Sequence, residues 1–495
     1  MHAPHDLRPV QLPSVAEAKA IFAGLMLVVF LAALNQTIVA TALPTIGRAC
    51  NDFENLSWVV IASLLTSTAV APLYGKLSDI YGRRATILAC IGIFLAGSAV
   101  CAAAPDMTFL VLGRALQGIG GGGILPVAQA IMADTITPRE RGRYQAYMGI
   151  VWVTSGVGGP VLGGVLAEHL HWSLVFWLNV PLALAAAAMT HTRLKKLPRH
   201  DRRHALDYLG AVLMMAATVP LLLALSWGGT RFTWTSPQVL ALVALSAILS
   251  FAFAWRLAVA PEPFLPLSVL KNPVMRWGST ANAFAMGASI SLVIYAALYF
   301  ELVHKLTASE SGFALIPLAL TTPGSLLSGR AMLHMQHYKR VPIAGLAVGT
   351  LAIAVLSAWP LAPLWLAITL LGIVGIAIGT CFPICTVSIQ NAVPNHQVGV
   401  AMGAMNFFRA LASAFAVAIM GAIVLIGFGA APQRGMGVAT VVQAAHTAGD
   451  LSHVFSYVFA AGTVFMLCAL IALIVMEERP LRGRSDPVAA AQPAE

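Results

Sequence analysis

The chain has 495 residues, of which 59% are hydrophobic and only 10% are charged. A soluble domain carries about 25% charged residues, so the composition excludes a soluble globular protein and indicates a protein that crosses a membrane many times. The net charge of +10 does not indicate nucleic-acid binding, because the basic residues are spread through short loops. Residues 1–20 are polar and the next apolar run is too long for a signal peptide, so we expect that run to insert as the first spanning helix.

Fourteen apolar runs are long enough to cross a bilayer as helices, at about 20 residues per span. Cytoplasmic loops carry an excess of Lys and Arg, and this excess tests the count. With the N-terminus inside, 23 of the 29 Lys and Arg residues fall in cytoplasmic segments and four fall outside, so both termini are expected to be cytoplasmic. The expected spans are 21–43, 56–74, 85–104, 107–133, 144–166, 172–190, 206–226, 238–256, 276–300, 311–330, 341–358, 363–388, 398–427 and 454–476.

The spans divide into two groups of six with two more between them. Transporters are often built from two pseudo-symmetric halves around a site at the membrane midplane. We therefore expect an all-α polytopic membrane protein with two six-helix bundles and two inserted central helices. The expected segments are a tail at 1–20, an N-terminal bundle at 21–190, a basic loop and the inserted pair at 191–275, a C-terminal bundle at 276–476, and a tail at 477–495.

A short charged turn separates the second and third spans, and residues 75–84 fit the pattern G-x-L-x-D-x-x-G-R-R. Gly75 and Gly82 permit a close-packed reversal of the chain. Asp79 is placed to cap a neighbouring helix or to pair with an arginine. The pattern closely resembles the signature loop between helices 2 and 3 of the major facilitator superfamily of transporters, which implies the major facilitator fold. A degenerate second copy is expected at residues 329–340, without an Asp.

Asp134, at the inner end of the fourth span, is near enough to the cytoplasmic face to pair with Arg83 or Arg84. Asp79 could meanwhile cap a helix of the opposite half. Together with the two glycines of the loop, these residues would form a gating latch that holds the outward-open state and breaks as the halves rock. The alternative is static surface pairing, which contributes little stability.

The first span, at residues 34–44, resembles the helix-1 motif of the fourteen-helix drug:proton antiporter branch of the superfamily (EmrB/QacA-type). That motif usually has an acid where this chain has Asn35. An amide cannot take up a proton, although it donates and accepts hydrogen bonds. Asn35 and the adjacent Gln36 are candidates for the substrate cavity, and the alternative for Asn35 is a purely structural hydrogen bond between helices.

The fourth span contains Arg114 and, one turn further along, Gln117. A charge inside a span costs about 2.5–3.5 kcal/mol on insertion scales, so Arg114 needs a polar partner or environment. The pair matches the R-x-x-Q-G element of the superfamily, whose arginine is implicated in proton coupling. Both residues are candidates for the cavity, and the alternative is an arginine that only braces helices.

The fifth span carries the core G-P-x-x-G-G, made by Gly159, Pro160, Gly163 and Gly164. In a bundle, Gly and Pro allow a kink and close helix packing. The core resembles the motif that the superfamily associates with exporters rather than importers, with Ser155 in place of a usual glycine. Residues 176–181 resemble the helix-6 signature of the same branch.

The second half offers fewer motifs, and its cavity candidates are Asn282, Tyr295, Tyr299 and Asn406. The two tyrosines could stack on a ligand, or Tyr299 could belong to an interfacial aromatic belt. Glu301 joins Arg114 and Asp134 as a proton-coupling candidate, with a solvated loop acid as the alternative. A second embedded charge, Arg409, needs a partner or water. Cys381 and Cys385 share a helix face, and buried free thiols are favoured over a metal pair.

The resemblance implies a secondary efflux transporter of amphipathic or drug-like compounds, with proton antiport by alternating access in the cell inner membrane. Expected partners are a small-molecule substrate, protons and membrane lipids, with a periplasmic adaptor and an outer-membrane channel as further candidates. No cofactor, metal or nucleic acid is expected. One alternative is an uncoupled facilitator or a transporter of lipids or anionic metabolites, which Asn35 favours. A multipass membrane enzyme is a more distant alternative. It would need a catalytic or metal-binding motif at a membrane face, and the sequence has no HExxH motif and no CxxC pair.

Overall fold

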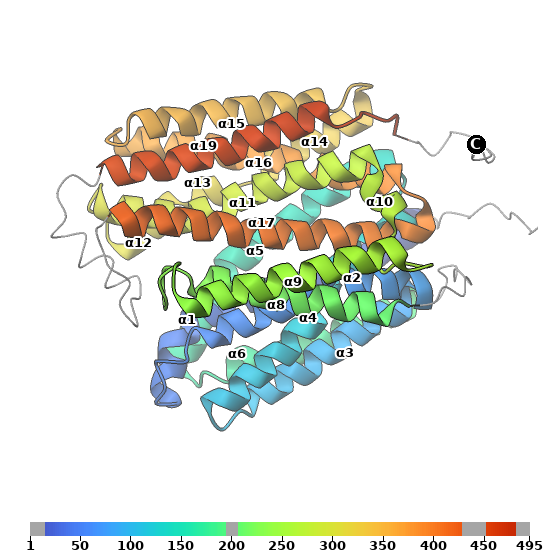
Figure 1. Ribbon diagram of the computed structural model, residues 1–495, viewed down its shortest axis with the longest axis horizontal. Coiled ribbons are helices and arrows are strands. Elements are labelled where there is room, and N and C mark those ends of the chain that lie inside the picture. The colour runs from blue at the N-terminus through green and yellow to red at the C-terminus, as the bar shows by residue number, and fades with distance from the viewer. Residues whose placement is uncertain (1–14, 195–205, 428–451, 482–495) are drawn as a thin grey trace, which may run out of the picture.

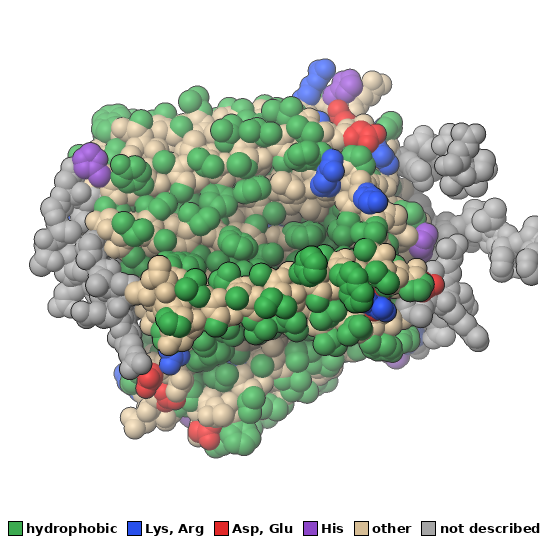
Figure 2. Space-filling model, viewed as in Figure 1, with side chains coloured by type: hydrophobic (Ala, Val, Ile, Leu, Met, Phe, Trp, Pro, Cys, Tyr) green, Lys and Arg blue, Asp and Glu red, His purple; other side chains and the backbone are tan. Residues whose placement is uncertain are grey.

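The computed structural model of the chain describes residues 15–194, 206–427 and 452–481. Among these residues, every named element is a helix. In the described part of the chain, fourteen helices or helix groups are long and apolar enough to cross a membrane, which confirms the number of spans expected from the sequence. Figure 2 shows hydrophobic side chains along the flank of the bundle and charged side chains mainly toward its two ends, as expected when lipid surrounds the middle.

The N-terminal half lies in the lower part of Figure 1 and the C-terminal half in the upper part. The first half consists of α1 (Val15–Ala49), α2 (Trp58–Tyr81), α3 (Arg83–Ala102), α4 (Met107–Thr135), α5 (Pro138–His169), α6 (Leu174–Trp177) and α7 (Asn179–Arg193). The second half consists of α11 (Pro273–Leu302), α12 (Ala308–Ala314), α13 (Ile316–Ala319), α14 (Thr322–His334), α15 (Arg340–Ala358), α16 (Leu364–Ala392), α17 (Val398–Gly427) and α19 (Ser452–Val475).

The inserted pair, α8 (Tyr208–Trp227) and α9 (Pro237–Val259), is followed by the short α10 (Leu267–Lys271). Asp207 joins the two inserted helices, because its carboxylate accepts from the backbone N–H of Gly210 at 3.0 Å and pairs with Arg256 of α9 at 3.0 Å. Helix α8 packs on α2 of the first half and on α17 of the second. The insertion therefore lies along one seam between the halves.

The tenth span is broken, which corrects the single helix expected at 311–330. It consists of α12, α13 and α14, and the helix is interrupted at Leu315 and at residues 320–321. Pro317 and Pro323 lie in the first turns of α13 and α14, where the missing N–H of proline costs nothing. These prolines cannot donate to a preceding helical turn, so they favour new helix starts over one continuous helix.

Helices α3 and α4 approach closely through glycines. A Cβ added to Gly120 would lie 2.7 Å from the Cα of Phe94, and one added to Gly97 would lie 2.6 Å from the Cα of Gln117. Backbone atoms cannot move aside as a flexible side chain can, so these positions require glycine. Small residues are the usual way in which membrane helices gain van der Waals contact.

We predict that Gly120→Leu separates α3 from α4 and destabilises the protein by about 1–3 kcal/mol or more, the usual range for overpacking. The matched control is Gly92→Leu on the exposed face of α3, where an added Cβ meets nothing within 4 Å. Thermal unfolding of both purified variants in the same detergent checks this. Equal melting temperatures for the two variants would contradict the packing described.

Candidate functional site

The two halves meet at the end of the bundle that the charge bias predicts to be cytoplasmic. Helix α2 crosses α17, and α5 crosses α14. Gly75 of α2 faces Gly399 of α17 so closely that a Cβ on Gly75 would lie 3.2 Å from the Cα of Val400. Gly142 of α5 faces Gly329 of α14 in the same way, with 2.9 Å from an added Cβ on Gly329 to the Gly142 carbonyl oxygen. The halves thus touch through two pairs of glycines.

Asp79 joins the first crossing by capping a helix of the other half. Its two carboxylate oxygens accept from the backbone N–H groups of Gly399 and Val400, at 3.0 and 2.8 Å. These are orphan donors in the first turn of α17, where the helix dipole favours a negative charge. The sequence predicted a cap on the opposite half, and the structure has that contact.

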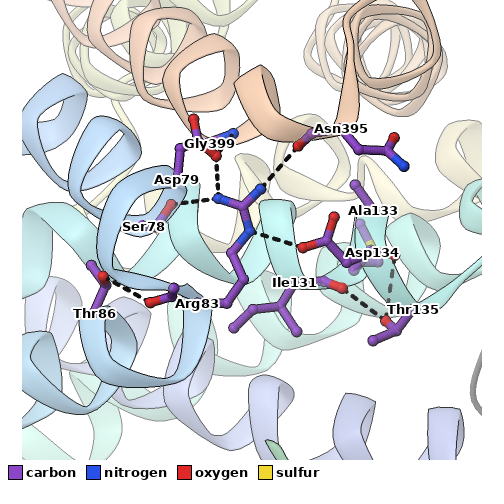
Figure 3. Close-up of polar contacts among 12 residues, drawn as sticks. Ser78, Asp79, Arg83, Thr86, Ile131, Ala133, Asp134, Thr135, Asn395 and Gly399 are labelled. Atoms are coloured by element: carbon purple, nitrogen blue, oxygen red, sulfur yellow. Dashed lines mark hydrogen bonds and ion pairs between the residues drawn. The ribbon is translucent and has the colours of Figure 1, made fainter. Parts of the chain in front are cut away.

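Arg83 holds this cap in place from below (Figure 3). Its Nη1 donates to Asp79 and, at 2.8 Å, to the hydroxyl of Ser78, while its Nε donates to Asp134 of α4 at 2.9 Å. Its Nη2 donates to the carbonyl of Asn395, just before α17, at 3.2 Å. The three charged side chains are at most 9% exposed. One guanidinium therefore connects α2, α3 and α4 to the second half.

The other two residues of the predicted latch have different places. Arg84 contacts His191 of α7, with its Nη2 3.0 Å from the Nε2 of the ring, so it bonds within the first half rather than to Asp134. Gly82 joins α2 to α3 at φ +89°, a left-handed conformation that disfavours any side chain, and an added Cβ there would meet nothing within 4 Å. Gly82 is thus required by the backbone and not by packing.

A polar layer that contains the predicted cavity residue Asn406 lies deeper in the bundle, around Gln129, which the sequence did not single out. The side-chain oxygen of Gln129 in α4 accepts from the Asn406 amide of α17 at 2.7 Å, and its backbone carbonyl accepts from Gln390 of α16 at 3.0 Å. Five residues separate Gln129 from Asp134, which places the layer about 8 Å further into the membrane at 1.5 Å per residue. The signal available in the sequence was a single amide, Gln129, within an otherwise apolar run.

Arg114 and Gln117 lie inside the first half. The Nε of Arg114 donates to the carbonyl of Val59 in α2 at 2.8 Å, and its Nη1 donates to Gln117. The amide of Gln117 donates to the hydroxyl of Ser98 in α3 at 2.7 Å. Both side chains are buried, so in this conformation the pair is closed to the space between the halves and joins three helices.

The remaining cavity candidates divide by exposure. Asn35 accepts from the Asn179 amide of α7 at 3.1 Å inside the first half, whereas Gln36 is exposed. Tyr295 is partly exposed and donates to the Val417 carbonyl of α17 at 3.0 Å. Asn406, in the polar layer, is buried. In this conformation, Gln36 and Tyr295 are therefore the accessible members of the group.

Two further candidates belong to the core of the second half. Asn282 is fully buried, and neither atom of its amide has a hydrogen-bond partner among the described residues. Tyr299 is also buried; its hydroxyl donates to the Pro360 carbonyl at 2.8 Å, and its ring packs against Phe455 and Phe459. Glu301, two residues further along, is partly exposed. Tyr299 therefore packs inside this half instead of facing the other half.

The glycines of the fifth span face α1. Added Cβ atoms would lie 2.8 Å from the Cβ of Thr37 at Gly159 and 3.1 Å from the Cγ1 of Ile38 at Gly163, whereas Gly164 faces open space. Helix α5 continues through Pro160 from Pro138 to His169. The motif therefore lets α1 and α5 pack closely.

The described residues contain no group of three or more His, Cys, Asp or Glu side chains that could hold a metal ion. The sulfur atoms of Cys381 and Cys385 lie 3.5 Å apart within α16, and both side chains are buried. Two thiols without a third ligand do not make a zinc site.

The family model described as Major Facilitator Superfamily matches residues 25–417. The chain is 31% identical over 401 residues to the multidrug transporter protein MdtP of Bacillus subtilis, covering 81% of this chain and 74% of that protein. It is 33% identical over 402 residues to the multidrug resistance protein fnx1 of Schizosaccharomyces pombe, covering 79% and 76%. An uncharacterized MFS-type transporter of Mycobacterium tuberculosis is 33% identical over 411 residues, covering 81% of this chain and 59% of that protein.

Solved structures with the same fold include the human organic anion transporter MFSD10, with a TM-score of 0.62 at 17% identity, covering 93% of this chain and 99% of that one. A bacterial homologue of the iron transporter ferroportin in an outward-facing state has a TM-score of 0.61 at 11% identity, covering 92% and 98%. At these identities the likeness establishes the fold.

We predict that Asp79→Ala exposes the first turn of α17, because Gly399 and Val400 lose their acceptor and Arg83 loses one of its two carboxylates. Removing one partner from a buried charge pair costs about 3–5 kcal/mol. Hydrogen–deuterium exchange should become faster in peptides that cover residues 395–405.

The matched control is Asp106→Ala, because Asp106 caps α4 at the other end of the bundle by accepting from Phe109 at 2.9 Å. That variant should change exchange only near residue 109. Unchanged exchange at residues 395–405 in Asp79→Ala would show that the cap does not stabilise α17.

Proposed function

The chain belongs to the major facilitator superfamily, and we propose that it exports small amphipathic or drug-like compounds by proton-coupled antiport with alternating access. Its relatives named as multidrug transporters support the substrate class. The observation that carries the mechanism is the position of the contacts between the halves. Within the described residues, the hydrogen bonds between the halves gather at one end, around Asp79, Arg83 and Gln129.

A bundle held together at one end suits alternating access. With both termini in the cytoplasm, as the charge bias predicts, this conformation is closed inside and faces outward. The inward-facing state requires the Asp79 cap to leave α17 and both glycine pairs to separate. Substrate or proton binding must then favour the inward-facing state by at least the free energy of these contacts, because a ligand shifts an equilibrium only by its difference in affinity for the two states.

Two carboxylates around one guanidinium offer a route for proton coupling. Arg83 forms ion pairs with two carboxylates, those of Asp79 and Asp134. Protonation of either acid removes one attraction and weakens the contact between the halves. We test Asp134 first, because Asp79 also caps α17 through Gly399 and Val400, so replacing Asp79 would break the contact between the halves directly. In this proposal the latch itself senses the proton, and Glu301 remains the alternative acid.

The uncoupled facilitator remains a second candidate because of Asn35. Its carbonyl accepts from Asn179, so two amides occupy the place where the antiporter branch usually has an acid. A transporter of this kind would equilibrate its substrate without regard to a pH gradient. Location in the cell inner membrane, and assembly with a periplasmic adaptor and an outer-membrane channel, are proposals that rest on the resemblance.

We predict that liposomes containing the protein accumulate the dye ethidium when their lumen is acidic. A gradient of about one pH unit corresponds to about 1.4 kcal/mol per proton, enough for up to tenfold accumulation at a stoichiometry of one. Dye fluorescence before and after collapse of the gradient with nigericin gives the coupled part, and protein-free liposomes are the control. Uptake that ignores the gradient would favour the facilitator, and uptake equal to that of protein-free liposomes would contradict export of such dyes.

The Asn35→Asp variant tests where coupling resides. If the latch carboxylates carry the proton, Asn35→Asp should leave the gradient dependence of uptake close to that of the wild type, while Asp134→Asn should abolish it. Gradient dependence that appears only in Asn35→Asp would mean that coupling has been lost at that position in the natural chain.

A further inference from the structure

We infer that Arg409 binds the anionic group of a transported compound, so that the substrates include organic anions with an apolar body. The inference rests on the proposed transport function and names a substrate class for it. Arg409 lies in the middle of α17. Four features support the assignment: the helix face that Arg409 occupies, its depth, the lack of a counter-charge among the described residues, and its neighbours.

Arg409 lies on the inward face of α17. At 100° per residue it shares a stripe with Met402, Met405 and Ala416, all of which are buried. The exposed side chains Phe408 and Phe415 lie on another face of the helix. The Arg409 side chain is itself partly exposed in spite of its buried neighbours on this stripe. The guanidinium is thus directed into the bundle and not toward lipid.

The depth of Arg409 is near the membrane midplane. Ten residues separate it from Gly399, which corresponds to about 15 Å along the helix, half the thickness of a hydrocarbon core of about 30 Å. It lies one turn beyond Asn406, whose amide bonds Gln129 of the other half. Arg409 therefore lies just beyond the polar layer, on the side away from the closed end, where a substrate held between the halves would be found.

Arg409 differs from the buried arginines of the chain in having no acceptor among the described residues. Arg83 has two carboxylates, Arg114 has a carbonyl and an amide, and Arg141 donates to the carbonyl of Ile136. Within the described residues, the Arg409 guanidinium has no ion pair or hydrogen bond, and its contact is with the Phe382 ring of α16, 5.9 Å from the centroid. Charged residues at such depth are costly and usually functional.

The chemistry of the site selects an anion. A guanidinium presents its donors as a planar fork that matches the two oxygens of a carboxylate or sulfonate. The ring of Phe382, under the guanidinium, provides an apolar surface for the body of the ligand. A cationic compound such as ethidium would have to bind away from Arg409, because it would meet a like charge there with no acid among the described residues near enough to pair with Arg409. The site therefore fits an organic anion with an aromatic or aliphatic body.

The test uses two ligands with one apolar body and opposite charges, tritiated 1-naphthaleneacetate and 1-naphthalenemethylamine. Equilibrium binding to the purified full-length chain is measured for the wild type, Arg409→Met and Arg409→Lys. We expect the wild type to prefer the anion. Arg409→Met should raise the dissociation constant of the anion at least tenfold, about the loss of one charge-assisted hydrogen bond, and Arg409→Lys should keep part of the affinity.

The matched control is Arg231→Met, because Arg231 also lies over an aromatic ring, 5.6 Å from the centroid in Trp227, but on the exposed surface. It should bind both ligands as the wild type does. Arg409→Met should melt at the same temperature as the wild type or higher, because it removes an unpaired embedded charge, whereas an arginine with only a structural role would lower the melting temperature when replaced. If Arg409→Met does not fold, Arg409→Gln takes its place.

Three results would overturn the assignment: equal affinity of the wild type for both ligands, binding of neither ligand, or anion binding that survives Arg409→Met. Because the assay measures binding without transport, these results are independent of the ethidium experiment. Dye export with no anion preference would leave the exporter proposal intact and reject the role of Arg409. Anion binding that depends on Arg409, in a protein that moves no dye, would support the role of Arg409 and reject the export of such dyes.

Discussion

The closed end of the molecule depends on one buried guanidinium. Arg83 lies between Asp79 and Asp134, and Asp79 in turn caps the first turn of α17 in the other half. Each group in this set is satisfied only while the others stay in place. A buried charge that loses its partner is strongly destabilising, so the set is expected to be formed as a whole or released as a whole. That property makes it suitable as a two-state element between the halves.

The two crossings at this end are similar in packing and different in charge. Both use a glycine pair, Gly75 with Gly399 and Gly142 with Gly329, so both let backbones approach closely. Among the described residues, only the first crossing has an acid that caps a helix of the other half. Residues 329–340, where the sequence predicts a second copy of the loop, contain no Asp. We therefore expect the α2–α17 side to respond to protons and the α5–α14 side to contribute packing alone. The polar layer around Gln129 separates this end from the level of Arg409.

The spans and the contacts around Arg83 could be predicted from the sequence. Apolar length and basic loops fix the spans, and the loop motif places Asp79 and Arg83 together. The cap by Asp79 and the pairing of Asp134 with Arg83 follow from charges that lie at one membrane face. The side chains inside the membrane could not be placed in the same way. Whether Arg114 or Tyr299 faces the other half or its own half depends on the rotation of each helix, and an almost wholly apolar helix gives little periodic signal for that rotation. The break in the tenth span was missed because prolines in spanning segments are tolerated in kinks and starts alike.

The most direct test of the latch is the distance between the halves at the end it closes. Tyr81 and Met335 are exposed at this end, one in each half, and suit spin labels once the partly exposed Cys50 and Cys468 are replaced. Electron–electron double resonance should give one short distance in the otherwise wild-type protein and a second, longer population in Asp79→Ala. The same distance distribution in both proteins would show that the Asp79–Arg83–Asp134 set does not hold the halves together.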